Sequence, residues 1–447
     1  MLIFQNQLTL IHFYKLWQIA KIKWYYKENN DGVILNKVKR FSFIFLCILF
    51  FSCKSSQIEK KEVVEPQKQI ETENQIETEK STTIQKKQNN EITLLFGGDI
   101  MAHSVNYAIT DYAKIWKDIT PLLQSSDLAF ANIEAPIDTT KKHSSWPNFN
   151  MTYNYVNASI TAGFNVFSLC NNHTNDQGLT GIQETAKTTK ALQTAAKNQN
   201  KDIYFSGIKN SPNDSFSYNL IEKNGWKILF LPITELLNRP NYSEYINFSK
   251  PTVEQRQKII ELCKELKAKT KCDLFIFSLH TAEPEYTRKV TDAQEEYYMN
   301  LLNAGVDIIW ANHAHIIKDR KFIFDTKNQR HKMIMYANGN TISGQRTAPD
   351  FKSKNPIGER DNTGDGLLYQ VIFSKEEKEG KTAITIKKAT PHFITTYINT
   401  ANEYVIKLLN KDFVDYLYDV PRTNWVEYIK RRIKINNRET KDLIVWQ

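Results

Sequence analysis

Apolar runs separated by polar turns organise the chain between residues 92 and 317. The pattern predicts strands at Ile92–Phe96, Leu128–Ile133, Asn165–Cys170, 202–208, 216–234, 274–280 and 306–317. The stretches 179–197, 253–269 and 292–305 instead repeat their apolar residues at helical spacing. Strands that alternate with helices predict an α/β fold with layered α-β-β-α architecture.

Polar side chains able to bind metal end one predicted strand after another. They are Asp99, Glu134, Asn171-Asn172-His173, His280, and His313 with His315. Taken alone, the stretch "FSLCNNHTNDQG" (167–178) is equally an ordinary turn, because Asn, Asp and Gly favour turns and helix caps. Sites in α/β folds gather at the carboxyl ends of strands. Five such fragments in order therefore favour a site for divalent ions such as Mn, Fe or Zn.

Composition is that of a globular protein, with 447 residues of which 41% are apolar and 24% charged. Half of the +10 net charge lies in residues 1–52, which hold seven Lys or Arg and two Asp or Glu. The middle of the chain has no dense basic stripe with interleaved aromatic residues, so we expect no nucleic-acid partner. Cys170, Cys263 and Cys272 are expected to pack as small apolar residues, although a Cys263–Cys272 bridge stays open.

The N-terminal part has the pattern of a secretion signal. Three basic residues precede the apolar run Phe41–Phe51, which is too short to span a bilayer and is followed by Ser52-Cys53. This ending resembles a bacterial lipoprotein cleavage site. We therefore expect residues 1–52 to be an N-terminal extension with a signal peptide, and lipidated Cys53 to anchor the exported chain to a cell-envelope membrane. A short uncleaved anchor is the alternative.

Two further segments flank the predicted core of residues 92–396. Residues 53–91 are rich in Glu, Lys, Gln and Thr without an aromatic residue, which predicts a disordered tether. A charged helix ending at Pro66 is the alternative. Residues 397–447 have helical spacing and many aromatic residues, so we expect a C-terminal helical extension packed on the core.

Five segments of the chain resemble a known family. They are "GGDIM", "SSDLAFANIEAPI", "AGFNVFSLCNNHTNDQGLTGIQET", "SLHTAE" and "AGVDIIWANHAHII", in the order and spacing of the poly-γ-glutamate capsule biosynthesis (CapA-type) proteins. These proteins are a branch of the calcineurin-like metallophosphoesterase superfamily, and the resemblance covers roughly residues 92–345. It implies a metallophosphoesterase-like sandwich and a hydrolase site with two divalent ions (Mn, Fe, Zn or Mg).

The resemblance also implies a role for each matching residue. Asp99 and His315 would hold the first metal, Glu134 would bridge both, and Asn172, His280 and His313 would hold the second. His173 would contact the phosphate and protonate the leaving group, with Asp176 orienting it. Asn171, Glu283 and His103 are expected on the substrate side. The chain reads Asp99-Ile100-Met101 where phosphoesterases generally have Asp-x-His, a difference that CapA-type proteins share. The first metal would then lack a ligand that His103 would supply. A site with a single metal, or with one weakly bound metal, is the alternative.

These expectations combine into a function in cell-envelope or capsule polymer biosynthesis, of the poly-γ-glutamate type. The chain would hydrolyse or transfer a phosphoryl group of a phosphoester or an anionic envelope polymer, in a complex with a membrane-bound polymer synthase. One alternative is a non-catalytic envelope lipoprotein that binds an anionic polymer. Another is a cytosolic nucleotidase, which requires Cys53 to be unlipidated.

Overall fold

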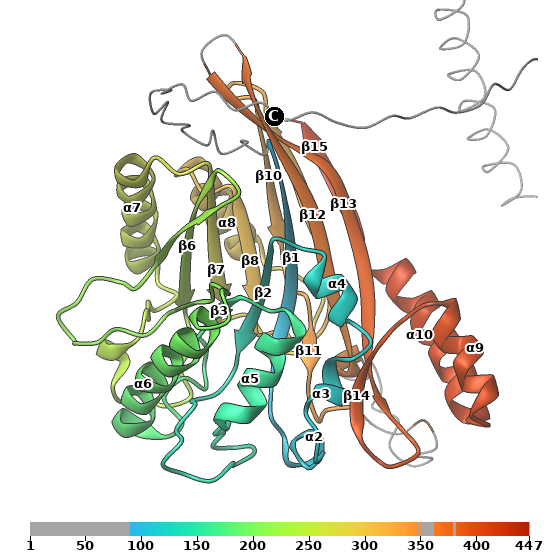
Figure 1. Ribbon diagram of the computed structural model, residues 1–447. Coiled ribbons are helices and arrows are strands. Elements are labelled where there is room, and N and C mark those ends of the chain that lie inside the picture. Colours follow the sequence, from blue (N-terminus) through green and yellow to red (C-terminus); the bar gives the residue numbers. More distant parts are fainter. Residues whose placement is uncertain (1–89, 347–348, 350–361, 379–380, 447) are drawn as a thin grey trace, which may run out of the picture. The chain divides into compact units, whose positions relative to one another are not determined.

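The computed structural model describes residues 90–346, 349, 362–378 and 381–446 (Figure 1). The expected signal peptide, Cys53 and most of the tether lie outside these residues. Within the described part of the chain, no helix is both long and apolar enough to cross a membrane.

Fifteen strands of the described residues are joined by hydrogen bonds. They are β1 (Glu91–Ile100), β2 (Leu128–Ile133), β3 (Val166–Ser168), β4 (Tyr204–Ser206), β5 (Asn219–Lys223), β6 (Trp226–Thr234), β7 (Leu274–His280), β8 (Ile308–Asn312), β9 (Arg320–Asp325), β10 (Arg330–Met335), β11 (Asn340–Ile342), β12 (Asp365–Lys378), β13 (Lys381–Ile398), β14 (Tyr404–Leu408) and β15 (Asp442–Trp446). The main order is β4-β3-β2-β1-β12-β13-β10-β8-β7-β6-β5.

The sheet folds over to form two facing layers. Leu94 and Phe96 of β1 pack in one buried cluster with Phe230 of β6 and Trp310 of β8, so these side chains fill the space between the layers. Leu95, between them in sequence, belongs instead to a cluster on the outer face. Successive strand residues point to opposite faces. An apolar residue at every β1 position from 94 to 96 therefore indicates burial on both faces.

Helices cover both outer faces of the two layers (Figure 1). One outer cluster includes residues of α3 (Ala113–Trp116), α4 (Thr120–Gln124), α5 (Tyr153–Ala162) and α6 (Gly178–Lys197). The other includes residues of α7 (Val253–Thr270) and α8 (Asp292–Asn303). Two short elements, α2 (Ser104–Tyr107) and the 3-10 helix η1 (Ser243–Tyr245), lie in loops. The expected α/β fold with layered α-β-β-α architecture is therefore confirmed.

Parallel pairing places the predicted ligands at strand ends. The strands β1 to β4 run parallel in one layer, and β6, β7, β8 and β10 run parallel in the other. The carboxyl ends of neighbouring parallel strands therefore share an edge. The candidate site lies at this edge.

The expected C-terminal extension is partly helical. Helices α9 (Lys411–Asp419) and α10 (Thr423–Glu439) agree with the prediction over about half of its length. The prediction is wrong for Tyr404–Leu408, which forms β14 against β13, and for Asp442–Trp446, which forms β15 beside β9. Short segments with β-branched and aromatic residues pair readily with a free strand edge, and helical spacing of apolar residues does not exclude this. The expected boundary at residue 396 falls inside β13.

The structure also shows whether the three cysteines of the folded part are buried and whether two of them form a bridge. Cys170, Cys263 and Cys272 are buried free thiols, so Cys263 and Cys272 are not bridged. Cys263 packs from α7 into the cluster beneath that helix.

Candidate metal centre

Six predicted metal ligands meet at the carboxyl edge of the sheet. Asp99 is in β1, Glu134 follows β2, Asn172 follows β3, His280 ends β7, and His313 and His315 follow β8; all six are buried. The carboxylates and histidines among them belong to overlapping groups of three, and within each group the ligand atoms lie within 4.8 Å of one another. Residues more than 200 positions apart in the sequence are thus brought into one cluster.

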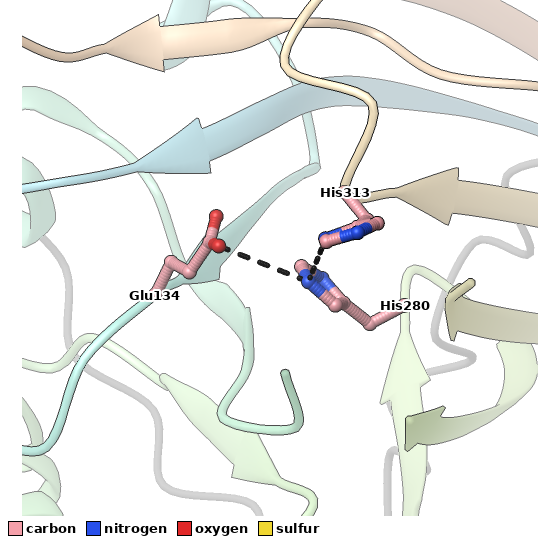
Figure 2. A group of neighbouring side chains, drawn as sticks. All are labelled: Glu134, His280 and His313. Carbon is pink, nitrogen blue, oxygen red and sulfur yellow. Dashed lines mark hydrogen bonds and ion pairs between the residues drawn. The ribbon is translucent and has the colours of Figure 1, made fainter. Parts of the chain in front are cut away.

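The first group contains Glu134, His280 and His313, which point toward one another (Figure 2). Nε2 of His280 lies 3.1 Å from Nδ1 of His313 and 3.8 Å from Oε1 of Glu134. Oδ1 of Asn172 lies 2.8 Å from the same His280 nitrogen. The amide of Asn172 donates to Asn238 at 3.3 Å, which leaves its oxygen turned to the cluster. Four predicted ligands of the second metal therefore converge.

The second group contains Asp99, Glu134 and His315. Nδ1 of His315 lies 3.2 Å from Oδ2 of Asp99, and its Nε2 lies 3.8 Å from Oε1 of Glu134. Asn132 donates a 2.8 Å hydrogen bond to the other oxygen of Asp99. Glu134 belongs to both groups, so its carboxylate lies within reach of the ligands expected for each metal.

The electrostatics of the cluster favour a bound cation. Neither carboxylate oxygen of Glu134 has a hydrogen-bond partner among the described residues. Burial and the nearby Asp99 raise the pKa of Glu134 well above its usual value. Burial alone would lower the pKa of His315, but Glu134 and Asp99 outweigh it and raise that pKa to about 10. A buried carboxylate without a hydrogen-bond partner is costly, so a divalent ion fits here.

The histidines of the other group are in the form that binds metal. Burial and the neighbouring His313 lower the pKa of His280 well below its usual value. Burial and His315 lower the pKa of His313 to about 3. Both imidazoles are therefore neutral at pH 7, as a metal ligand must be.

Backbone geometry at the cluster is unusual. His313 and His315 have φ angles of +97° and +55°, which residues other than glycine seldom adopt. Gly98 of β1 is packed against the backbone that leads to Asn340, because a Cβ on it would lie 1.8 Å from the carbonyl oxygen of Gly339. Strained backbone of this kind gathers at functional sites.

The expected proton-transfer pair lies beside the cluster. Nδ1 of His173 is 2.6 Å from Oδ2 of Asp176, and both side chains are buried. The backbone N–H of Phe149 donates to the same oxygen of Asp176 at 2.8 Å, which holds the carboxylate in place. The amide nitrogen of Asn238 lies 3.3 Å from both ring nitrogens of His173. Residues from two other loops therefore help to fix this imidazole.

A hollow of about 530 Å³ opens next to this pair. Asp176 and Asn238 line it, together with Lys141, Arg239 and Tyr242. Lys141 has Asp138 at 3.5 Å. Within the described part of the chain, Arg239 forms no ion pair, and its guanidinium donates to Oδ1 of Asn148. The hollow thus presents positive charge close to His173.

The three expected substrate contacts lie in different environments. Asn171 is buried, donates to the carbonyl of Ile133 at 2.7 Å and accepts the N–H of His173, so it shapes the turn. Glu283 accepts from Lys318 at 3.0 Å and from the N–H of Thr291. His103 accepts the N–H of Gly344 at 3.1 Å. No metal-capable group of the described residues includes His103.

Three asparagines support the ligands, and no role was predicted from the sequence for two of them, Asn132 and Asn238. Asn132 contacts Asp99 and lies 3.4 Å from Nδ1 of His280, Asn340 lies 3.0 Å from Nδ1 of His315, and Asn238 contacts Asn172 and His173. Asn132 precedes Glu134 by two residues, and this spacing is a signal that was available in the sequence. Asn238 lies in a loop with no comparable signal.

Comparison with known proteins identifies the family. Residues 93–345 match the family described as "Bacterial capsule synthesis protein PGA_cap". This match covers more than half of the chain, so the chain belongs to that family, and the CapA-type resemblance is confirmed.

Two relatives carry related names. The chain is 28% identical over 274 residues to "Capsule biosynthesis protein CapA" of Bacillus anthracis, covering 59% of this chain and 62% of that one. It is 25% identical over 269 residues to "PGA biosynthesis protein CapA" of Bacillus subtilis (strain 168), covering 59% and 66%. The chain therefore spans less than two thirds of either relative.

Solved structures with some likeness have lower identity. A hypothetical protein from Thermus thermophilus has a TM-score of 0.37 at 14% identity, covering 68% of this chain and 98% of that one. The calcineurin-like phosphoesterase YfkN from Bacillus subtilis also has a TM-score of 0.37, at 12% identity, covering 76% and 99%.

Proposed function

We propose that this chain is a metal-dependent hydrolase that acts at a phosphoryl centre during synthesis of an anionic cell-envelope polymer. One observation carries the proposal. The buried carboxylate of Glu134, without a hydrogen-bond partner among the described residues, lies between two groups of metal-capable side chains. The His173–Asp176 pair lies in the turn that also carries Asn172. Metal-capable groups and an oriented imidazole are the parts that phosphoester hydrolysis requires.

Each ligand has a defined place in this mechanism. Asp99, Glu134 and His315 would hold one divalent ion, and Asn172, His280 and His313 the other, with Glu134 shared. Bound ions supply positive charge for the phosphoryl oxygens and lower the pKa of a bound water. Asn132 holds Asp99 and Asn340 lies beside His315, so the ligand positions are fixed before substrate arrives.

His173 moves the proton. With Nδ1 donating to Asp176, Nε2 is the nitrogen that exchanges a proton with substrate. Protonated His173 gives this proton to the leaving oxygen. Asp176 stabilises the imidazolium and keeps the ring in one orientation, while Asn238 and the N–H of Phe149 limit its movement. Asp176 is thus a positioning residue.

The positively charged hollow supports an anionic substrate. Arg239 and Lys141 lie beside Asp176, where they would bind phosphate or carboxylate groups flanking the bond to be cleaved. The names of the two relatives, which refer to capsule and PGA biosynthesis, agree with a polymer of this charge.

The same proposal places the chain at a membrane. The signal-like segment before Cys53 supports export and lipidation, and residues 54–89 would tether the folded part near a membrane-bound polymer synthase. Growth of cells with a fatty-acid analogue should label the wild-type chain and leave Cys53→Ser unlabelled. Equal labelling of the two would contradict the anchor.

Metal analysis and hydrolysis assays test the enzymatic proposal. The full-length chain, purified in detergent, should retain divalent metal and hydrolyse an aryl phosphomonoester or phosphodiester with Mn²⁺. The double variant Asn172→Ala, His280→Ala should lose hydrolysis and one of the two ions, because it removes ligands of the second metal only. Absence of metal, together with a wild-type rate equal to that of the double variant, would overturn the hydrolase.

A polymer-binding role without catalysis is the second candidate. The exposed Arg239, without an ion pair among the described residues, favours it independently of the metal ligands. Binding of an anionic polymer that survives both chelation and the double variant, with no hydrolysis by the wild type, would select this role.

A further inference from the structure

The ion expected at Asp99 has an incomplete set of ligands. Asp99, Glu134 and His315 supply three protein side chains, and the Asp-x-His histidine is replaced by Met101. Met101 is buried in the apolar cluster behind the site. His103, expected to compensate, is not part of any metal-capable group of the described residues. The additional ligand must come from elsewhere.

A third group contains that ligand. Glu285, on the loop between β7 and α8, lies with His313 and His315 so that one ligand atom of each is within 4.8 Å of the others. Metal–ligand bonds to nitrogen and oxygen are about 2.0–2.2 Å long. Two ligand atoms of one ion are therefore at most about 4.4 Å apart, so a group within 4.8 Å needs only a small side-chain movement to bind one ion. Glu285 is exposed, whereas the two histidines are buried.

The loop that carries Glu285 is attached to the histidine segment on both sides of this residue. Before it, Glu283 binds Lys318 at 3.0 Å. After it, the N–H of Tyr286 donates to the carbonyl of Ala314, between the two histidines, at 3.0 Å. The guanidinium of Arg288 donates to the carbonyl of Ile317. These contacts fix the loop against residues 314–318 and direct Glu285 toward His313 and His315.

The two glutamates of this loop differ in what they bind. The carboxylate of Glu283 is engaged by Lys318 and by the N–H of Thr291. Within the described residues, no lysine or arginine forms an ion pair with Glu285, and its metal-capable neighbours are the two histidines. Glu285 is therefore the acidic residue of the loop that remains available to an ion.

We propose that Glu285 is a metal ligand that replaces the missing Asp-x-His histidine. This inference rests on the metal centre of the proposed function. His315 belongs both to the group of Asp99 and Glu134 and to the group of Glu285, so Glu285 would add a third carboxylate to the ion that His315 binds as the nitrogen donor. An oxygen-rich donor set of this kind suits Mn²⁺ or Mg²⁺ better than Zn²⁺. The ion bound at this position would thus be a hard divalent cation.

Metal titration without substrate tests the assignment. The full-length chain in detergent is freed of metal with a chelator, and free Mn²⁺ is followed by electron paramagnetic resonance during titration. The wild type should bind two ions. Glu285→Gln should keep one site unchanged and lose at least about tenfold in affinity at the other, since even outer contacts to ligands alter affinity tenfold or more.

A matched variant separates ligation from charge. Glu296→Gln removes the same charge from an exposed position on α8, outside every metal-capable group of the described residues, and should bind as the wild type does. Because Glu285 is exposed, its variant should unfold at the wild-type denaturant concentration when metal is absent. Two wild-type affinities in Glu285→Gln would overturn this proposal and leave the metal centre standing. Absence of Mn²⁺ binding by the wild type would overturn both.

Discussion

The imidazole of His173 and the carboxylate of Asp176 lie 2.6 Å apart, three residues apart in one buried turn. Phe149 and Asn238 reach the pair from two other loops, so its geometry depends on the folded chain. Removing Asp176 should therefore affect the chemical step more than substrate binding.

Asp176→Asn should lower kcat about 10- to 100-fold and leave KM nearly unchanged, because orientation of a general acid contributes mainly in the transition state. Asn retains an acceptor for the N–H of Phe149, so folding should be preserved. Aryl phosphodiester hydrolysis with Mn²⁺ measures both constants. His173→Ala should cost at least as much. A change in KM alone would show that the pair binds substrate without transferring a proton.

Arg239 should determine affinity for anionic substrates. Arg239→Ala should raise KM about tenfold or more with kcat nearly constant, since a charge-assisted hydrogen bond contributes about 1.5–3 kcal/mol. Arg239→Lys should recover part of the loss. Arg431→Ala, an exposed arginine on α10, serves as the control and should behave as the wild type. Equal KM values in all variants would exclude the hollow as the anion site.

Metal removal should destabilise the folded part of the chain. At a Mn²⁺ concentration 100 times Kd, binding contributes about 2.7 kcal/mol to the free energy of unfolding. A chelator should thus lower the melting temperature by about 3–4 °C, as followed by circular dichroism. His280→Ala should reduce the Mn²⁺-dependent gain, because it removes a ligand of one of the two sites, whereas His331→Ala, on β10, should retain the full gain. A wild-type chain indifferent to chelator would contradict a tightly bound ion.

The carboxylate of Asp365, in β12, connects helix α10 to the sheet. Its carboxylate binds Arg346 and accepts from Arg432 at 2.7 Å and from Asn436 at 2.8 Å, all buried. Asp365→Asn should lower the free energy of unfolding by about 3–5 kcal/mol at pH 7, measured by urea denaturation. Asp419→Asn, exposed at the end of α9, should change it by less than about 0.5 kcal/mol.

The loss in free energy of unfolding caused by Asp365→Asn should depend on pH. Burial alone would raise the pKa of Asp365, but Arg432 and Arg346 outweigh it and lower that pKa. The folded state therefore favours the ionised form. The contribution of ionised Asp365 to the free energy of unfolding is complete above the pKa of about 3.9 that the group has in the unfolded chain. It is lost as the pH falls through the lower pKa of the folded state. The difference between wild type and Asp365→Asn should be constant from about pH 8 to pH 5 and narrow below about pH 4. A difference that widens in acid would contradict the ion pairs.

The sequence by itself determined the layered fold and the kinds of ligand at each strand end. Periodicity of apolar residues is a local property, so the strands from Ile92 to Asn312 and the helices α6, α7 and α8 could be predicted. Helix α5 and the short helices α2 to α4 were not predicted. Asp99, Glu134, Asn172, His280, His313 and His315 were selected because parallel strands collect their ends at one edge.

The tertiary structure decided what local pattern cannot express. Tyr404–Leu408 is a strand because β13 offers it an edge, and Glu285 rather than Glu283 faces the histidines because Lys318 engages Glu283. Asn238 supports His173 from a loop 65 residues away. Each outcome depends on contacts between segments that are far apart in the sequence. The free energy of such contacts cannot be read from any single stretch. The local sequence thus determines which ligand types follow each strand, and the tertiary structure determines which of these side chains lie together.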